Sequence, residues 1–232
     1  MPLTNSPRQR RIPPVVLRRL WIVCLVVAVA LLGACTIDPI KDAQRTLEGV
    51  PSDKLAEARA LEQAGEHAEA AERYLTLAKA ETPPARQQLE LNGANALLRA
   101  GDSTAASRVL TGIDRDRLTA AQRELVLLLE ADVALQRGRA AEAIAKLQRV
   151  NKGVLPSELK SQYYGTLAAA YRLDKQPIQA AESLDDLDKL LKGDPAARLD
   201  NQVSLLFTLA TLGRSGLDEA AGETRGRIGG WV

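Results

Sequence analysis

The stretch that decides the fold is Gln63-Ala64-Gly65-Glu66-His67-Ala68-Glu69-Ala70, followed by Tyr74 one helical turn later. Glycine readily takes the backbone shape that ends a helix, so a helix ending at Gly65 and a second one carrying Ala70 are expected. The same spacing returns at Gly101, Gly138 and Lys175, so that the four positions lie 36, 37 and 37 residues apart. We call these four residues the anchors, and their regular spacing indicates a repeat.

Two kinds of residue recur with the anchors. An alanine lies seven residues before each anchor and another lies five residues after it, where only a small side chain lets two helix axes approach closely. A large residue lies nine residues after each anchor. The alanines are Ala58, Ala94, Ala131, Ala168, Ala70, Ala106, Ala143 and Ala180, and the large residues are Tyr74, Leu110, Leu147 and Leu184.

The pattern predicts an all-α fold, a right-handed solenoid of helical hairpins. The low aromatic content of 3% and the dominance of alanine and leucine favour helices over strands. The helices are expected at 52–64, 67–80, 83–100, 103–112, 119–137, 140–150, 157–173, 177–192 and 196–212, with a shorter one at 217–224. A non-repeating, alanine-rich helical bundle is the alternative.

Several helix starts carry capping signals. Thr119 and Gln122 have the spacing of a capping box. Thr82-Pro83 and Asp194-Pro195 each place a capping side chain before a proline, which suits the first helical position. Ser52 and Ser157, each after a proline, are predicted as further caps.

The stretch around Gly65 and the stretch Leu135 to Ala143 resemble the tetratricopeptide repeat. The resemblance implies stacked helix pairs with a concave groove that binds peptides or partner helices. The chain departs from that repeat in three ways. Its period exceeds the usual 34 residues, the early tryptophan and leucine of each first helix are mostly missing, and the fourth anchor is Lys175.

The amino terminus has the layout of a secretory signal peptide. Five arginines and no acidic residue precede the apolar run Trp21 to Leu32, and Leu32-Gly33-Ala34-Cys35 closes it. This ending resembles the bacterial lipobox, which implies cleavage of residues 1–34 and a lipid on Cys35. An uncleaved membrane span, although short of the usual length of about 20 residues, and a plain secretory signal stay open as alternatives.

The rest of the chain is expected to follow in three parts. Residues 35–51 form a lipidated amino terminus and tether, 52–212 form the solenoid, and 213–232 are a glycine-rich tail or a junction to a further domain. Thr36 stands where enteric-type lipoproteins kept at the inner membrane have aspartate. The resemblance therefore implies sorting to the outer membrane, with the protein on its periplasmic face.

Charge and composition exclude several functions. Without residues 1–34 the chain has 26 basic and 29 acidic residues, and no basic run suggests a nucleic-acid partner. The only cysteine left is Cys35 and the only histidine is His67, so no metal site is predicted. Asp185 and Asp188 share a helical face that we expect to be solvated. We predict no catalytic residue, no cofactor and no small-molecule substrate, and hence no enzyme.

What remains is a binding surface. In a helical solenoid the first helix of each pair lines the inner face, where a protein partner docks. The candidate partner-binding residues are Asn92, Asn95, Gln162, Tyr163, Tyr164 and Tyr171. Tyrosines make good interface anchors, and they serve equally well in packing between repeats.

Together these features resemble the amino-terminal part of penicillin-binding-protein activator lipoproteins of the LpoA type. The resemblance rests on Cys35 and its lipobox, on the leucine-rich repeat 125–138, on Asn201-Gln202 and on Gly230-Trp231. It implies a regulator that activates a bifunctional peptidoglycan synthase, a penicillin-binding protein, by protein–protein contact. A tetratricopeptide lipoprotein that scaffolds envelope or outer-membrane assembly is the alternative.

Overall fold

The computed structural model describes residues 46–213 and 216–218, all within a compact unit that spans Pro39–Val232. The predicted signal peptide, Cys35, the start of the tether and most of the glycine-rich tail lie outside the described residues. At the start of the described part, Leu47 and Val50 are buried and pack with the first helices.

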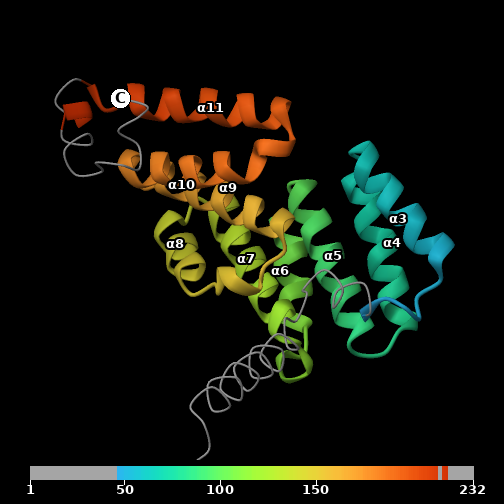
Figure 1. The fold of residues 1–232 in the computed structure, drawn as a ribbon. Helices are drawn as coiled ribbons and strands as arrows, with labels where there is room; N and C mark the ends of the chain where they lie inside the picture. The colour runs from blue at the N-terminus through green and yellow to red at the C-terminus, as the bar shows by residue number, and fades with distance from the viewer. Residues whose placement is uncertain (1–45, 214–215, 219–232) are drawn as a thin grey trace, which may run out of the picture. The chain divides into compact units, whose positions relative to one another are not determined.

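The described residues form nine α-helices and three short 3-10 turns, with no strand among them (Figure 1). The predicted all-α class is therefore confirmed. The helices are α3 (Ser52–Ala64), α4 (His67–Ala80), α5 (Ala85–Arg99), α6 (Ser103–Gly112), α7 (Ala120–Gln136), α8 (Ala140–Gln148), α9 (Ser157–Leu173), α10 (Pro177–Leu190) and α11 (Pro195–Ala210). The 3-10 turns are η2 (Arg115–Arg117), η3 (Lys152–Val154) and η4 (Leu191–Gly193).

Consecutive helices form pairs, and the pairs contact one another in a regular way. The pairs are α3–α4, α5–α6, α7–α8 and α9–α10, and α11 follows them. The second helix of each pair contacts the first helix of the next, and the first helices α5, α7 and α9 also contact in sequence. The buried apolar residues form three clusters, and α5 and α9 each contribute residues to two of them.

All four anchors take a left-handed backbone conformation. The φ angles are 82° at Gly65, 83° at Gly101, 73° at Gly138 and 60° at Lys175. After each anchor, a backbone N–H donates to the carbonyl five residues back at 2.8–2.9 Å, as from Gln176 to Tyr171. This bond pattern ends a helix when one residue is left-handed. The prediction that Lys175 replaces a glycine is confirmed.

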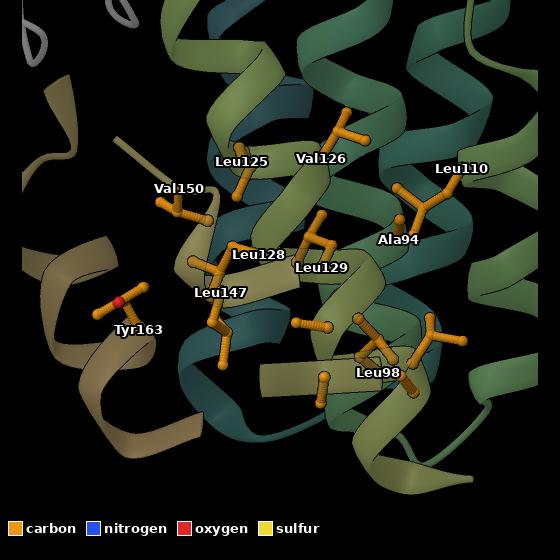
Figure 2. Packing of buried hydrophobic residues seen from close by; sticks show 14 of the residues in the cluster. Ala94, Leu98, Leu110, Leu125, Val126, Leu128, Leu129, Leu147, Val150 and Tyr163 are labelled. Carbon is orange, nitrogen blue, oxygen red and sulfur yellow. The ribbon is translucent and has the colours of Figure 1, made fainter. Parts of the chain in front are cut away.

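The repeating alanines lie where the helices cross. All eight are at most 1% exposed, and the four large residues that follow the anchors are at most 5% exposed. Figure 2 shows part of the largest cluster, in which Leu128, Leu147 and Tyr163 join α7, α8 and α9. Small residues at the crossings and large residues beside them explain the close packing of the pairs.

The capping predictions are partly right. Thr119 and Gln122 form a capping box, and the Asp194 side chain accepts a hydrogen bond from the Ala197 amide. Ser52 and Ser157 do not cap, because the proline before each takes the cap position and leaves serine as the first helical residue. The cap at Thr82 is also wrong, because α5 starts only after Pro84, at Ala85.

Candidate functional site

Polar side chains from three successive first helices meet across α5, α7 and α9. The Gln162 amide nitrogen donates to Asn95 Oδ1 at 3.2 Å and to Asp132 Oδ2 at 2.8 Å. The Thr166 hydroxyl donates to the other oxygen of Asp132 at 2.6 Å. We call Asn95, Asp132, Gln162 and Thr166 the polar network, and it connects three helix pairs.

The repeat brings these residues together. Asn95 and Asp132 both lie six residues before their anchors, so they take equivalent places on α5 and α7. Gln162 and Thr166 are four residues apart and share one face of α9. Because α7 contacts both α5 and α9, these faces meet in one surface.

Asp132 is the electrostatic centre of the network. Burial raises the pKa of its carboxyl group, against the opposing effects of the bonds from Thr166 and Gln162 and of the Arg99 charge. Both carboxylate oxygens already accept a hydrogen bond. Asp132 therefore holds Gln162 and Thr166 in place, while the free side of the network faces an open groove.

That groove has a volume of about 420 Å³, and eight of its nine lining residues are polar. Arg99 and Glu158 supply opposite charges, while Asn95, Gln136 and Gln162 supply amide groups. Amides donate and accept at once, which matches the needs of a peptide backbone. The groove suits an extended peptide segment.

Asn92 belongs to a second row of amides next to this network. Gln88 donates to Asn92 Oδ1 at 3.1 Å, and Gln122 donates to Gln88 at 3.4 Å and to the Pro84 carbonyl at 3.2 Å. Asn92 and Asn95 are three residues apart and lie on one face of α5. The two asparagines predicted as binding residues on α5 therefore lie on the same face of that helix.

The three tyrosines are in packing positions. Tyr163 is buried in the largest cluster, and Tyr164 and Tyr171 are half-buried against it. The rings of Tyr163 and Tyr164 meet edge to face at 5.1 Å, with the Lys152 ammonium 5.6 and 5.4 Å from their centres. Burial raises the pKa of Tyr163 to about 12. None of the three lines the polar groove.

Sequence reasoning missed Asp132, Thr166, Gln136, Arg99 and Glu158. A signal was present for the first, because Asp132 takes the repeat position of Asn95. Comparing equivalent places in each repeat would have paired them. The role of Thr166 depends on its contact with Asp132 on the neighbouring helix α7, which the repeat alone does not show.

The expectation that Asp185 and Asp188 face solvent is wrong. Their exposed fractions are 7% and 5%. Asp188 forms a two-pronged ion pair with Arg198 at 2.9–3.1 Å and accepts a bond from Gln202 at 2.9 Å. Asp185 pairs with Lys189 at 2.8 Å. Helix α11 covers this face and supplies Arg198 and Gln202.

His67 is the first residue of α4 and is half-buried. Within residues 46–213 and 216–218, no cluster of three metal-ligating side chains occurs. In the same part of the chain, no helix has both the length and the apolar character that a membrane span requires. The predicted apolar run Trp21 to Leu32 lies outside it.

Comparison with known proteins gives two matches. A family model described as "LppC putative lipoprotein" matches residues 28–232. The solved structure of Haemophilus influenzae LpoA is similar, with a TM-score of 0.59 and 24% identity over 69% of this chain. The chain spans about 29% of the length of that structure. No curated protein matches.

Proposed function

Because the chain belongs to the LppC lipoprotein family, we propose that it is anchored by a lipid on Cys35 to the periplasmic face of the outer membrane. From there it activates a bifunctional peptidoglycan synthase, a penicillin-binding protein, by direct contact. The family match supports the lipoprotein part of this proposal. The resemblance to activator lipoproteins of the LpoA type, with a similar helical fold, supports the part about the synthase.

The contact surface is the polar network with its groove. The observation that carries this proposal is the hydrogen-bonded polar network, in which three helix pairs contribute Asn95, Asp132 and Gln162 beside an open groove with Arg99 and Glu158. An extended segment of the synthase lies along α5, α7 and α9 and exchanges backbone hydrogen bonds with these amides. Arg99 and Glu158 pair with opposite charges on that segment.

The test is capture from the envelope. The tagged full chain is produced in a Gram-negative host, cross-linked, extracted in detergent and probed for penicillin-binding proteins. A variant with Asn95→Ala and Gln162→Ala removes two of the amide groups that line the groove. The matched control is Glu72→Ala on the exposed face of α4.

We expect recovery of a penicillin-binding protein, lowered at least several-fold by the groove variant and unchanged by the control. Equal recovery with the parent chain, the groove variant and the control would show that the groove is not the contact surface. Recovery of envelope-assembly proteins without any penicillin-binding protein would favour the scaffolding alternative and overturn activation. Circular dichroism of each purified variant checks that the helices remain.

A further inference from the structure

The groove beside the polar network continues towards α11. One of its lining residues, Ser161, also lines a second groove of about 460 Å³, to which α9, α10 and α11 contribute. The second groove shares Arg172 and Ser204 with a third one of about 610 Å³, at the ends of α9 and α11. We call the three the polar groove, the middle groove and the Phe207 groove. Because neighbouring grooves share lining residues, they form one path from α5 to α11.

The chemistry of this path changes along its length. The lining residue six places before the anchor is Asn95 on α5, Asp132 on α7 and Ala169 on α9. On α11 the lining residue six places before Gly213 is Phe207, whose side chain is 71% exposed. The path therefore begins among amides and a carboxylate and ends at an exposed aromatic ring.

Small residues of α9 line the middle groove. They are Gly165, Ala168 and Ala169. A Cβ atom added at Gly165 would meet no atom within 4 Å, so the space beside this part of α9 is open. Residues this small let another backbone approach a helix closely. An extended segment can therefore pass along the middle groove from the polar groove to the Phe207 groove.

The Phe207 groove has an apolar wall. Phe207 and Pro177 line it together with two threonines. The hydroxyl of Thr208 donates to the Ser204 carbonyl at 2.7 Å, and that of Thr211 donates to the Thr208 carbonyl at 2.6 Å. Both threonine protons are thus used within α11. This wall suits a bulky apolar side chain, which loses its contact with water there.

The same groove is positively charged. Its described lining residues include the exposed Arg172 and Lys175 and no carboxylate. The adjacent Asp174 accepts a hydrogen bond from the Gln176 side chain, and Asp200 is an acidic residue of the middle groove. Two cations beside an apolar wall complement an acidic side chain that follows or precedes an apolar one.

We propose that the three grooves hold one extended segment of a protein partner, in which a bulky apolar residue stands next to an acidic residue. The apolar side chain packs against Phe207 and Pro177, and the carboxylate pairs with Arg172 and Lys175. The rest of the segment passes Gly165 and continues into the polar groove. This inference rests on the proposed function for the presence of a segment in the polar groove, and it adds the chemistry by which that segment is recognised.

The length of such a segment follows from the stack. From α5 to α11 the path crosses three helix spacings of about 10 Å each. An extended chain covers this distance with about nine residues at about 3.3 Å per residue. A short linear segment is therefore sufficient, and no folded domain has to enter the path.

Four synthetic peptides of about 20 residues test the recognition. Each has a centre of phenylalanine–aspartate, phenylalanine–lysine, serine–aspartate or serine–lysine. A stretch of serine and asparagine on both sides lets either chain direction place it in the polar groove. Caps at both ends leave the central side chain as the only source of a carboxylate. Fluorescence anisotropy measures binding to the full chain in detergent.

We expect the phenylalanine–aspartate peptide to bind at least several-fold more tightly than each of the other three. Its affinity should fall as salt is added, because salt screens the exposed cations. Equal binding of all four peptides, or binding of none, would overturn the proposal.

Variants of the protein locate the apolar contact. We expect Phe207→Ser to lower the affinity for the phenylalanine–aspartate peptide to that for the serine–aspartate peptide. Leu173→Ser is the matched control, because Leu173 is 49% exposed on α9 and is not among the lining residues of the three grooves. Equal losses in the two variants would contradict a contact at Phe207.

A charge variant tests the second contact. Arg172→Gln with Lys175→Asn removes both cations, and asparagine tolerates the left-handed conformation at residue 175. We expect this variant to lose the preference for aspartate over lysine in the peptide. The control is Lys79→Asn with Arg108→Gln, which removes the same charge from exposed positions on α4 and α6. A preference that survives in the first variant would overturn the pairing.

Gly165→Leu tests whether one segment occupies all three grooves. Leucine is a better helix former than glycine, so the urea midpoint should not fall. Its side chain obstructs the middle groove, and we expect the affinity for the phenylalanine–aspartate peptide to drop at least several-fold. Unchanged affinity would contradict a continuous segment.

The envelope capture separates this inference from the proposed function. Recovery of a penicillin-binding protein that Phe207→Ser and the charge variant leave unchanged would keep the proposed function and overturn the inference. Selective peptide binding without recovery of any penicillin-binding protein would keep the recognition of an apolar–acidic segment and overturn the synthase as its source.

Discussion

Gln162 on α9 donates a hydrogen bond at 3.2 Å to Asn95 on α5, 67 residues earlier in the chain. The helix α7 contacts both α5 and α9, and its Asp132 accepts a second bond from the same amide. One glutamine therefore connects three helix pairs. The stack of first helices is fixed by apolar packing and, on this face, by a polar network.

Asp132 gives the network a testable pH dependence. Its carboxyl pKa is raised by burial, so the charged form lowers the free energy of unfolding above the folded-state pKa. That cost vanishes below the ordinary aspartate pKa of about 3.9. We expect Asp132→Asn to raise the free energy of unfolding at pH 7, with the gain shrinking as the pH falls towards 4.

Urea unfolding at several pH values measures this effect. Asparagine can still accept from Thr166. Gln162 and Asn95 can both turn their amides over, so that Gln162 Oε1 accepts from the new NH₂ group and from the NH₂ group of Asn95. The gain therefore reports the removed charge. A variant less stable than the parent by the same amount at pH 7 and pH 4 would show that the hydrogen bonds outweigh the burial of charge.

Lys175 is strained in its left-handed conformation, with φ of 60°. Left-handed backbone costs a residue with a Cβ roughly 1–2 kcal/mol, and glycine avoids this at some loss of unfolded-state entropy. We expect Lys175→Gly to stabilise the chain by about 0.5–1 kcal/mol, measured by urea unfolding. The reciprocal control Gly138→Ala, which meets no atom within 4 Å, should destabilise by about 1 kcal/mol.

The crossing alanines should tolerate no enlargement. Ala58 is 0% exposed on α3, while Ala60, two residues away on the same helix, is exposed. We expect Ala58→Leu to destabilise by about 1–3 kcal/mol through overpacking, and Ala60→Leu to change stability by less than about 0.5 kcal/mol. Thermal or urea unfolding of both variants checks this. Similar losses in the two would mean that α3 is not held at a close crossing.

Much of the fold could be predicted because the repeat is local. The anchor and its alanines lie within one hairpin. Their spacing, together with the prolines and polar residues at the helix starts, predicts the helices 52–64, 67–80, 103–112 and 157–173 with the bounds that the structure has. The burial of Asp188 could not be read in this way. It depends on Arg198 and Gln202, which reach it from the next helix, and a run of aspartates looks the same in sequence whether or not another helix covers it.

The candidate site was half predictable for the same reason. Asn95 and Gln162 were chosen because first helices line the inner face, and the structure joins them directly. Tyr163, chosen by the same rule, is instead buried in the cluster between repeats. Sequence shows that a residue is on a first helix, but neighbouring positions on that helix differ by about 100° in direction. This difference in direction determines whether a side chain faces the groove or the core.

The ion pair of Asp188 with Arg198 predicts the behaviour in acid. The Arg198 hydrogen bonds lower the Asp188 pKa more than burial raises it. The stability it contributes is present above the ordinary pKa and is lost as pH falls through the lowered value. We expect Asp188→Asn to cost about 1.5–3 kcal/mol at pH 7 and to flatten the acid limb of the stability curve. The exposed Asp200→Asn on α11 serves as the control and should change neither.

Anchoring through Cys35 predicts where the protein is found in the cell. A lipid contributes about 0.8 kcal/mol for each buried CH₂ group, and several acyl chains together hold a protein stably at a membrane. We expect Cys35→Ser to move the protein from the outer-membrane fraction to the soluble periplasm or to leave it unprocessed at the inner membrane. Density-gradient fractionation with immunoblotting measures this, and Cys24→Ser, within the predicted signal peptide, is the matched control.

Because Cys35 lies before the helical unit, the released protein should keep its helices and its urea midpoint. Outer-membrane retention of Cys35→Ser at the level of the control would mean that another part of the chain anchors the protein.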